Sequence, residues 1–226
     1  MGETAASPEG PVFAERPTEF IVRDAFLLGI LPLALAGVAG ALGAFWIGAS
    51  LLGATVFVAV FFRNPPRLVE GDERSVVAPA DGRVLEAGEI ELPDGSKAKR
   101  VGIFLSVFDV HVNRAPIAGR VVSIERGGQS FLAAFNRRAE TENARCTLTL
   151  ETGRGERVRV VQITGLIARR IVCYAREGDD LPRGLAYGLI CYGSRVELYL
   201  PASADVRVRV GDRVKGGASV IAEVSA

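Results

Sequence analysis

Residues 25–62 read AFLLGILPLALAGVAGALGAFWIGASLLGATVFVAVFF, and this run contains no charged side chain. Arg23 and Asp24 precede it, and Arg63 follows it. One helix crosses the hydrocarbon core of a bilayer with about 20 residues. The run is too long for one span at ordinary tilt and too long for a cleaved signal peptide. It therefore predicts a hairpin of two helices, over roughly 25–42 and 46–62.

Small residues in this run favour a tight hairpin. Three glycines near its middle can form the turn, namely Gly40, Gly43 and Gly48. Other small residues would let the two helices approach closely: Gly29, Ala36, Gly37 and Ala41. Arginines flank both ends, so the positive-inside rule predicts a cell-membrane protein whose following domain lies on the cytoplasmic side. A shallow re-entrant hairpin and a helical pair buried in a soluble core are the alternatives.

The chain changes character on both sides of the hairpin. Residues 1–24 form an N-terminal lead with several prolines, and residues 63–74 form a connector that Pro65 and Pro66 stiffen. From residue 75 to residue 226, short apolar runs alternate with Gly, Pro and Asp turns, which predicts strands. The expected strands are 76–78, 82–87, 99–105, 119–125, 146–151, 157–162, 171–173, 188–192, 195–200 and 218–224.

These patterns predict an α+β, mostly β, fold class. An N-terminal transmembrane or re-entrant helical hairpin precedes a β-rich, barrel-sandwich-like domain over 75–226. One further helix is expected over roughly 131–138. Two similar Gly/Asp turns leading into strands, 79–84 and 210–217, favour the barrel-sandwich comparison. They also suggest an alternative, a non-enzymatic carrier or adaptor domain on a membrane anchor, for which Lys215 lacks the expected apolar frame on both sides.

Composition narrows the classes of function. A net charge of +1 gives no electrostatic case for binding nucleic acid. The chain has three widely spaced cysteines and one histidine, so we expect no metal site of the Cys/His type. The cysteines lie among apolar neighbours, as small core residues do in a reducing compartment.

The step Gly193-Ser194 lies at the start of a predicted buried strand. Such a pair is the chemical precursor of a pyruvoyl group. The serine hydroxyl can attack the glycine carbonyl, and elimination and hydrolysis of the resulting ester leave a ketone in place of the serine amine. Glycine suits the acceptor side because it has no side chain to block attack. A plain turn is the alternative for an isolated Gly-Ser pair.

Polar residues that can move protons are few. If residues 104–116 form a strand entering a turn, alternation places Asp109, His111 and Asn113 on one face. His111 is the only histidine, and three polar groups on one face favour a site. Asp81, in an Asp-Gly turn, can orient the imidazole, although Asp-Gly is also common as a plain turn.

Several ordered motifs together resemble the short, membrane-associated form of phosphatidylserine decarboxylase. The resemblance runs from about Phe61 to the C-terminus. The motifs are Phe62-Arg63-Asn64-Pro65-Pro66-Arg67, Ala78-Pro79-Ala80-Asp81-Gly82, the stretch Asp109 to Pro116, Glu142-Asn143-Ala144-Arg145, Gln162-Ile163-Thr164-Gly165, Ala168-Arg169-Arg170-Ile171 and Tyr192-Gly193-Ser194-Arg195-Val196.

The resemblance implies a proenzyme that cleaves itself between Gly193 and Ser194, so that the Ser194 residue becomes the pyruvoyl group. Asp81, His111 and Ser194 match the positions that the family uses for cleavage. Longer members carry a second histidine three residues after the first, where this chain has Arg114. Either His111 serves both cleavage and turnover, or Arg114 or a water takes one of the two roles.

The resemblance also implies the reaction and the partners. The pyruvoyl ketone would form a Schiff base with the amine of phosphatidylserine and accept the electrons of the bond to the departing carboxylate. His111 would then protonate the carbanion. Asp109, Asn113, Arg114, Arg63 and Arg67 are candidates for substrate binding. We expect a phospholipid membrane as partner and a heterodimer of the two cleavage products, with a higher oligomer left open. A pyruvoyl decarboxylase for a soluble amino acid is a third hypothesis, although it gives the hairpin no purpose.

Overall fold

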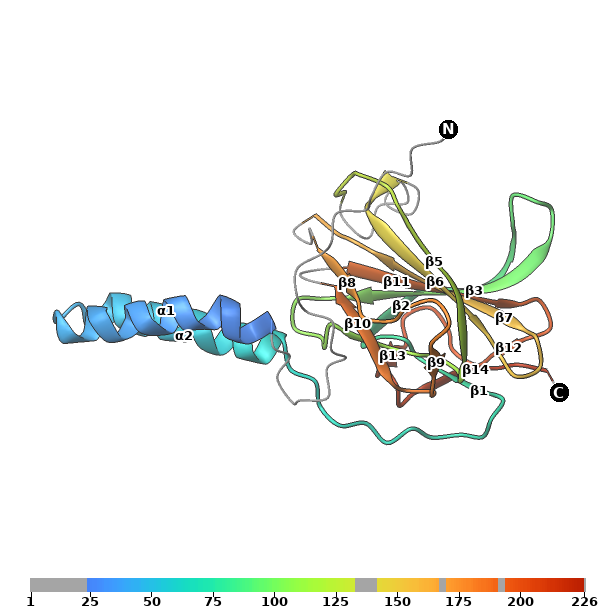
Figure 1. Ribbon diagram of the computed structural model, residues 1–226, viewed down its shortest axis with the longest axis horizontal. Helices are drawn as coiled ribbons and strands as arrows, with labels where there is room; N and C mark the ends of the chain where they lie inside the picture. Colours follow the sequence, from blue (N-terminus) through green and yellow to red (C-terminus); the bar gives the residue numbers. More distant parts are fainter. Residues whose placement is uncertain (1–23, 133–141, 167–169, 191–193, 226) are drawn as a thin grey trace.

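The computed structural model describes residues 24–132, 142–166, 170–190 and 194–225, and in it a helical hairpin projects from one end of a β-rich body (Figure 1). The predicted mostly-β class is confirmed. The helix expected over roughly 131–138 falls almost entirely outside the described residues, as does Gly193. The limits proposed for the lead, the connector and the β-rich domain stay predictions.

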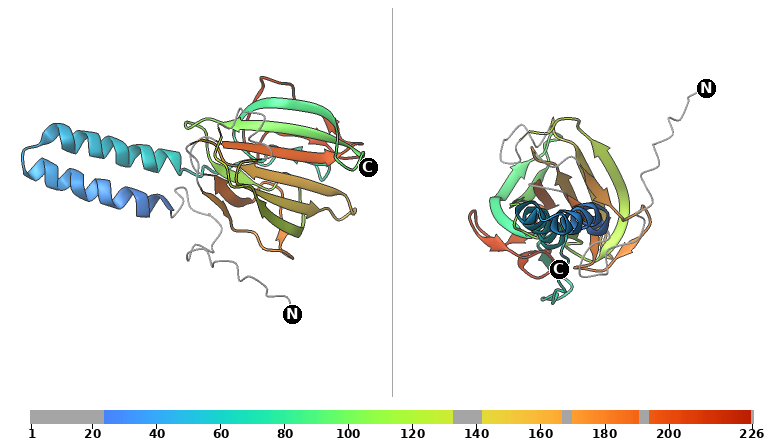
Figure 2. Two further views of the ribbon diagram at one scale, coloured as in Figure 1. Left: turned by 90° about the horizontal axis from the view of Figure 1, so that it is seen from above. Right: turned by 90° about the vertical axis from the view of Figure 1, so that its left-hand side faces the viewer.

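The hairpin consists of α1, Asp24–Ala41, and α2, Phe45–Phe61, which confirms both predicted helices to within one residue. Figure 2 shows the two helices side by side along their whole length. Gly43 has a φ of 76°, so the turn occupies a backbone conformation that glycine favours. A side chain added at Gly48 would lie 3.2 Å from the backbone oxygen of Ala36, which explains the small residue at this crossing.

Along most of the hairpin, large apolar side chains face outward. The exposed ones are Leu28, Ile30, Leu31, Leu33, Leu35, Val38, Leu42, Phe45, Trp46, Ile47, Leu52, Val56, Phe57 and Val60. Among the described residues, no helix combines the length and hydropathy needed to cross a membrane. The hairpin is therefore confirmed as a helical element, whereas its insertion in a membrane stays a prediction.

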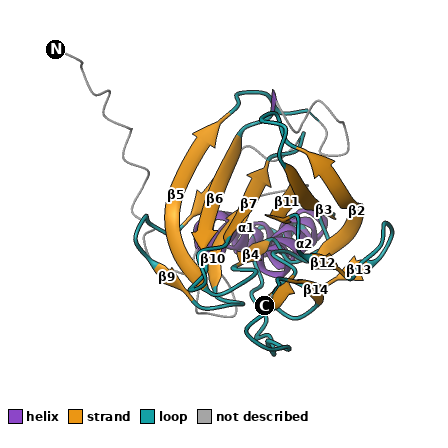
Figure 3. Cartoon of the chain, turned by 90° about the vertical axis from the view of Figure 1, so that its right-hand side faces the viewer, coloured by secondary structure: helices purple, strands orange, loops and turns teal. Residues whose placement is uncertain are grey.

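The β-rich body contains a large curled sheet and two small sheets. The strands are β1 Ser75–Val77, β2 Gly82–Glu91, β3 Lys97–Leu105, β4 Val112–Arg114, β5 Gly119–Gly127, β6 Arg145–Glu151, β7 Arg157–Ile163, β8 Ile171–Cys173, β9 Asp180–Leu181, β10 Ala186–Ile190, β11 Ser194–Pro201, β12 Asp205–Val206, β13 Arg213–Val214 and β14 Val220–Glu223. The large sheet has the order β13-β2-β3-β11-β7-β6-β5-β9. It curls around the small sheets β1-β14-β12 and β4-β10-β8 (Figure 3).

Strand β11 lies near the middle of the large sheet, where it pairs antiparallel with β3 and with β7. Its residues Val196, Leu198 and Leu200 belong to the main hydrophobic core. Alternation places Ser194 on this same core-facing side and Arg195 on the opposite side. The predicted strand over 195–200 is confirmed and begins one residue earlier, at the serine itself.

All ten predicted strands overlap an observed one, and the four that were missed are β4, β9, β12 and β13. Each missed strand has only two or three residues, too few for alternation to be recognised. The two similar turns, 79–84 and 210–217, meet in space because β13 pairs with β2. The barrel-sandwich description stays a prediction.

Residues 104–116 do not form the continuous strand that would place Asp109, His111 and Asn113 on one face. Strand β3 ends at Leu105, a turn follows, and β4 begins only at Val112. The carboxylate of Asp109 stabilises this turn by accepting from the backbone N–H and the hydroxyl of Ser106, at 2.8 and 2.7 Å. Because the turn interrupts the alternation, Val110, His111 and Val112 are all buried.

Candidate active site

Ser194 begins β11 inside the protein, opposite Leu105 of β3. The residue is completely buried, and its Oγ has no hydrogen-bond partner among the described residues. A buried hydroxyl without a partner lowers stability, so its presence needs another explanation. The arrangement fits a serine that is kept for reaction, because nothing else described in the structure uses its oxygen.

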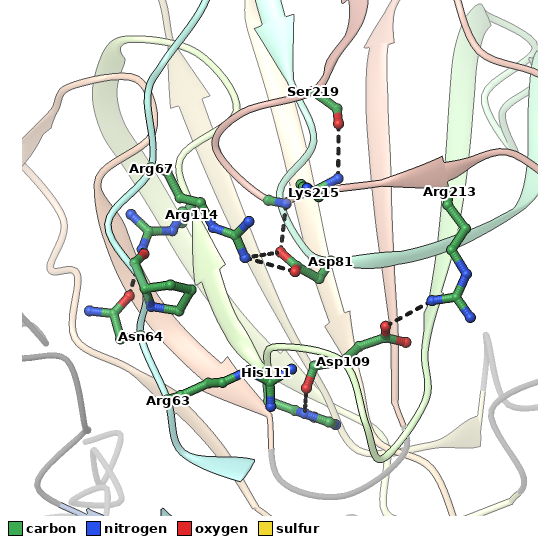
Figure 4. A network of polar contacts seen from close by, with 12 residues as sticks. Arg63, Asn64, Arg67, Asp81, Asp109, His111, Arg114, Arg213, Lys215 and Ser219 are labelled. Atoms are coloured by element: carbon green, nitrogen blue, oxygen red, sulfur yellow. Dashed lines mark hydrogen bonds and ion pairs between the residues drawn. The ribbon is translucent and has the colours of Figure 1, made fainter. Parts of the chain in front are cut away.

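His111 lies just before β4 and is only 2% exposed. Its Nδ1 is 2.9 Å from the backbone oxygen of Asp109 (Figure 4). A carbonyl oxygen can only accept, so Nδ1 carries the proton of the neutral ring, and Nε2 is left as the basic nitrogen. No described group bonds to Nε2. Burial lowers the pKa of His111 to about 4, and the carbonyl and charge of Asp109 oppose this shift.

Backbone pairing brings the segments that carry Ser194 and His111 to the same end of the body. The N–H of Ile190 donates to the backbone oxygen of His111 at 3.3 Å. Ile190 ends β10 four positions before Ser194, a separation that an extended chain spans in at most about 14 Å. On the other side, Ser194 pairs with Leu105, the last residue of β3 before the turn that leads to His111.

Asp81 lies in the turn before β2, and its carboxylate is engaged away from the imidazole. It accepts from Nη2 of Arg67 at 2.7 and 3.0 Å and from the N–H of Gly216 at 2.8 Å (Figure 4). Burial raises the pKa of Asp81, while the charge of Arg67 opposes the rise. No contact between Asp81 and His111 therefore supports the expectation that Asp81 orients the ring. The backbone oxygen of Asp109 is the group that lies against Nδ1.

The following glycine explains the fixed geometry of this turn. A side chain at Gly82 would overlap the backbone oxygen of Phe104 in β3. The Asp-Gly pair therefore lets β2 start close against β3 and holds Asp81 at the entrance of the strand.

Arg114 and Arg63 both hold the segment that joins the hairpin to the body. Arg114 donates to Oδ1 of Asn64 at 2.5 Å, to the Pro65 oxygen at 3.1 Å and to the Gly184 oxygen at 3.0 Å. Arg63 donates to the backbone oxygens of Val60 and Phe108, each at 2.7 Å. With Arg67 on Asp81, all three arginines among the substrate-binding candidates therefore bind groups of the protein itself.

The remaining candidates differ in their surroundings. Asp109 directs its carboxylate into its own turn and toward Arg213, whose Nη1 lies 3.2 Å away. Asn113 in β4 is completely buried and accepts from Nε2 of Gln162 in β7 at 2.7 Å. Its Nδ2 has no described partner. Asn113 thus carries an unused donor inside the body, next to the histidine segment.

Sequence reasoning missed two residues of this region as site candidates, Phe61 and Gln162. Phe61 ends α2, and its ring lies against the imidazole of His111, with the ring centroids 4.0 Å apart. Phe61 directly precedes one of the recognised motifs and Gln162 begins another, yet neither carries a group whose type alone predicts a role. No cluster of three potential metal ligands occurs among the described residues.

Comparisons with known proteins identify the family. Residues 54–222 match the family model described as phosphatidylserine decarboxylase. The chain is 47% identical over 197 residues to a phosphatidylserine decarboxylase proenzyme of Geobacter sulfurreducens, covering 86% of this chain and 90% of the relative. A protein of the same name from Cupriavidus pinatubonensis is 39% identical over 216 residues, 95% and 96% of the two chains. The chain belongs to the phosphatidylserine decarboxylase family, whose members generally depend on a pyruvoyl group.

Proposed function

We propose that this chain decarboxylates phosphatidylserine to phosphatidylethanolamine and CO2, after it has cleaved itself between Gly193 and Ser194. The observation that carries the proposal is the buried Ser194 hydroxyl, which has no described partner at the start of a central strand. Family membership adds independent support, since the similar relatives are named as proenzymes.

Self-cleavage starts with attack of Ser194 Oγ on the carbonyl carbon of Gly193, which transfers the acyl group from nitrogen to oxygen. Loss of the Ser194 α-proton then expels the Gly193 carboxylate, and water releases ammonia to leave the ketone. A base must take up the serine proton first. We assign this role to Nε2 of His111, the unprotonated nitrogen of a neutral ring.

The surroundings of Ser194 fit a pyruvoyl group, since the position is buried and its oxygen has no competing described partner. When formed, this group supplies a carbonyl that can accept the electron pair of the bond that breaks as CO2 leaves. His111 can hold at Nε2 the proton that the substrate carbon takes up. Asn113 can donate from Nδ2, for which the described residues offer no acceptor, to a polar atom of the substrate headgroup.

The two cleavage products are expected to stay together as a heterodimer. The smaller product, from residue 194 onward, contains β11, β12, β13 and β14. Its strand β11 pairs with β3 and β7, β13 pairs with β2, and β14 pairs with β1. All four partner strands belong to the larger product, so separation would break pairings in two sheets. The possible higher oligomer stays a prediction.

The hairpin is proposed to embed in the cell membrane, with the β-rich body on the cytoplasmic side. Its many exposed large apolar side chains support this, because solvated proteins rarely gather so many on one element. Arg63 and Arg67 follow the hairpin at its base, where basic residues gain about 1 kcal/mol each near anionic lipids. Labelling of single cysteines placed at residues 43 and 70 would distinguish a full crossing from a re-entrant insertion.

Intact mass and activity on lipid vesicles test the function together. The chain should yield a fragment that begins at residue 194, has a blocked N-terminus and reacts with hydrazines. It should then release CO2 from phosphatidylserine. An uncleaved, hydrazine-resistant chain of 24.0 kDa would refute self-processing. Release of CO2 from free serine or aspartate, but not from the lipid, would indicate a decarboxylase of soluble amino acids.

A further inference from the structure

The last turn of α2 differs from the rest of the hairpin because it is buried in the β-rich body. Phe61 is 1% exposed and Phe62 is 2% exposed. They belong to a second hydrophobic cluster, which we call the junction cluster. Its buried members are Phe61, Phe62, Val110, Val112, Tyr174, Ala186 and Leu189. The hairpin therefore ends inside the body rather than at its surface.

Phe61 is the member of the junction cluster that stacks on the histidine. Its ring centroid lies 4.0 Å from that of His111, with 32° between the planes. Phe62 packs edge-on against Phe61, with centroids 5.1 Å apart, and Phe57 lies one turn earlier at 6.1 Å. The hairpin thus contributes one wall of the space around the imidazole.

This contact has two chemical consequences. An aromatic ring over the imidazole excludes water, which disfavours the charged form of the histidine. It also limits rotation of the ring, so that Nδ1 stays on the Asp109 oxygen and Nε2 keeps no bond to any described group. Two charged groups act on the ring as well: Asp109 favours its protonation and Arg63 opposes it.

We propose that Phe61 is a positioning residue, through which the seating of the hairpin on the β-rich body sets the proton chemistry of His111. The inference rests on the proposed function only for the role of His111 in catalysis. It means that the hairpin completes the active site, in addition to any anchoring, so that an enzyme with a displaced hairpin would carry a hydrated, mobile imidazole.

The single histidine gives a direct measurement. One imidazole signal in the NMR spectrum of the full chain in micelles reports on His111 alone. Phe61→Leu should raise its titration midpoint by roughly one pH unit or more toward the ordinary value, because water regains access. Phe62→Leu makes the same chemical change in the neighbouring buried residue and should leave the midpoint nearly unchanged. Recording both variants also in Ser194→Ala protein removes any effect of different processing.

Activity provides the second readout. Phe61→Leu should lower kcat on phosphatidylserine vesicles by about tenfold, a fraction of what loss of a general base costs. It should also move the acidic limb of the pH–rate profile in the same direction as the NMR midpoint. If Phe61→Leu does not fold, Phe61→Met keeps most of the volume and serves in its place.

The outcomes separate the two claims. Equal midpoints in the Phe61 variant, the Phe62 variant and the unmodified chain would overturn the proposal. A moved midpoint with an unmoved pH–rate profile would overturn its catalytic part. A chain that shows the midpoint shift but neither processes itself nor releases CO2 would refute the proposed function. The effect of Phe61 on the titration of His111 would still be supported.

Discussion

The two faces of β11 differ in the partners that their polar groups have. On the core side, Ser194 buries a hydroxyl that no described group bonds. On the opposite side, the buried Arg195 forms ion pairs with Glu197 at 2.9 Å and, from the same guanidinium, with Glu86 of β2 at 3.2 Å. A side chain at Gly102 would lie 2.9 Å from Nη2 of Arg195, so this glycine leaves room for the guanidinium to reach across β3.

This difference suggests how the backbone can be cleaved before Ser194 while β11 stays in place. The two adjacent residues have different roles. The oxygen of Ser194 is available for reaction, while the side chain of Arg195 pairs with carboxylates on β11 and β2. Tyr199 extends this paired side by donating to Glu197 at 2.5 Å, and burial raises the pKa of Tyr199 to about 12. We therefore expect substitution of Ser194 to change chemistry and substitution of Arg195 to change stability.

Ser194→Ala tests the reactive side and should have the largest effect. Without the hydroxyl no attack on Gly193 can occur, so cleavage and CO2 release should both fall to background while the melting temperature stays near its original value. Mass spectrometry and a vesicle assay measure these outcomes. Ser203→Ala, at an exposed serine downstream, is the matched control and should process normally. Cleavage that persists in Ser194→Ala would remove the basis of the proposed function.

His111→Gln should lower processing or turnover by about 10²–10⁴-fold, the usual contribution of a general acid or base. Glutamine keeps a polar side chain that can still donate to the Asp109 oxygen, so the fold should persist. Following cleavage over time, and turnover after cleavage, tells which of the two steps needs the imidazole. Normal rates in both steps would exclude His111 from the mechanism.

Arg195→Met tests the paired side and should destabilise the protein by about 3–5 kcal/mol, because it takes the guanidinium partner away from the buried carboxylate of Glu197. Glu86 loses one of two arginines, since Arg100 still pairs with it. Arg157→Met is a matched control in the neighbouring strand β7, where the arginine pairs with Glu151 at the exposed surface. It should cost less than about 1 kcal/mol. Denaturant unfolding of both variants compares them, and equal losses would contradict the assignment of the paired face to stability.

The buried histidine predicts a pH dependence of stability. Its pKa is about 4 in the folded chain, below the 6.5 of an exposed imidazole, so between these values the unfolded chain binds more protons. Stability should therefore fall as the pH falls from about 6.5 to about 4, by up to about 3 kcal/mol. The difference between the unfolding curves of the unmodified chain and His111→Gln isolates this contribution from the carboxyls. A difference that does not change with pH would contradict the burial of a neutral imidazole.

Arg67→Gln should have the smallest effect, a loss of about 1–2 kcal/mol, because it removes the ion pair with the partly buried Asp81. The loss should appear at the connector first, as faster proteolysis between the hairpin and β1. Arg207→Gln, which removes ion pairs of a half-exposed arginine near the C-terminus, is the control. Activity that falls far more than stability would instead favour the substrate-binding role predicted for Arg67.

More of the fold than of the candidate site could be predicted from the sequence. Both helices were predicted from the long run without charged residues, and ten strands from short apolar runs between turn residues. Both patterns are local properties of the sequence. The contacts of Asp81 and Arg114 did not follow, because their partners Arg67 and Asn64 lie in a connector whose path along the body no local pattern encodes. The alternation expected for Asp109, His111 and Asn113 failed because a turn stabilised by Asp109 itself interrupts the strand.

The amino-acid sequence by itself determined the apolar hairpin, the strand-rich body, the Gly-Ser step and the single histidine, since each depends on residue type and spacing along the chain. Only the tertiary structure decided that the end of the hairpin covers His111, that Asp81 binds Arg67, and that ion pairs form on one side of β11 while Ser194 lies on the other. These are contacts between residues far apart in the chain, and they arise where packing brings separate segments to the same place.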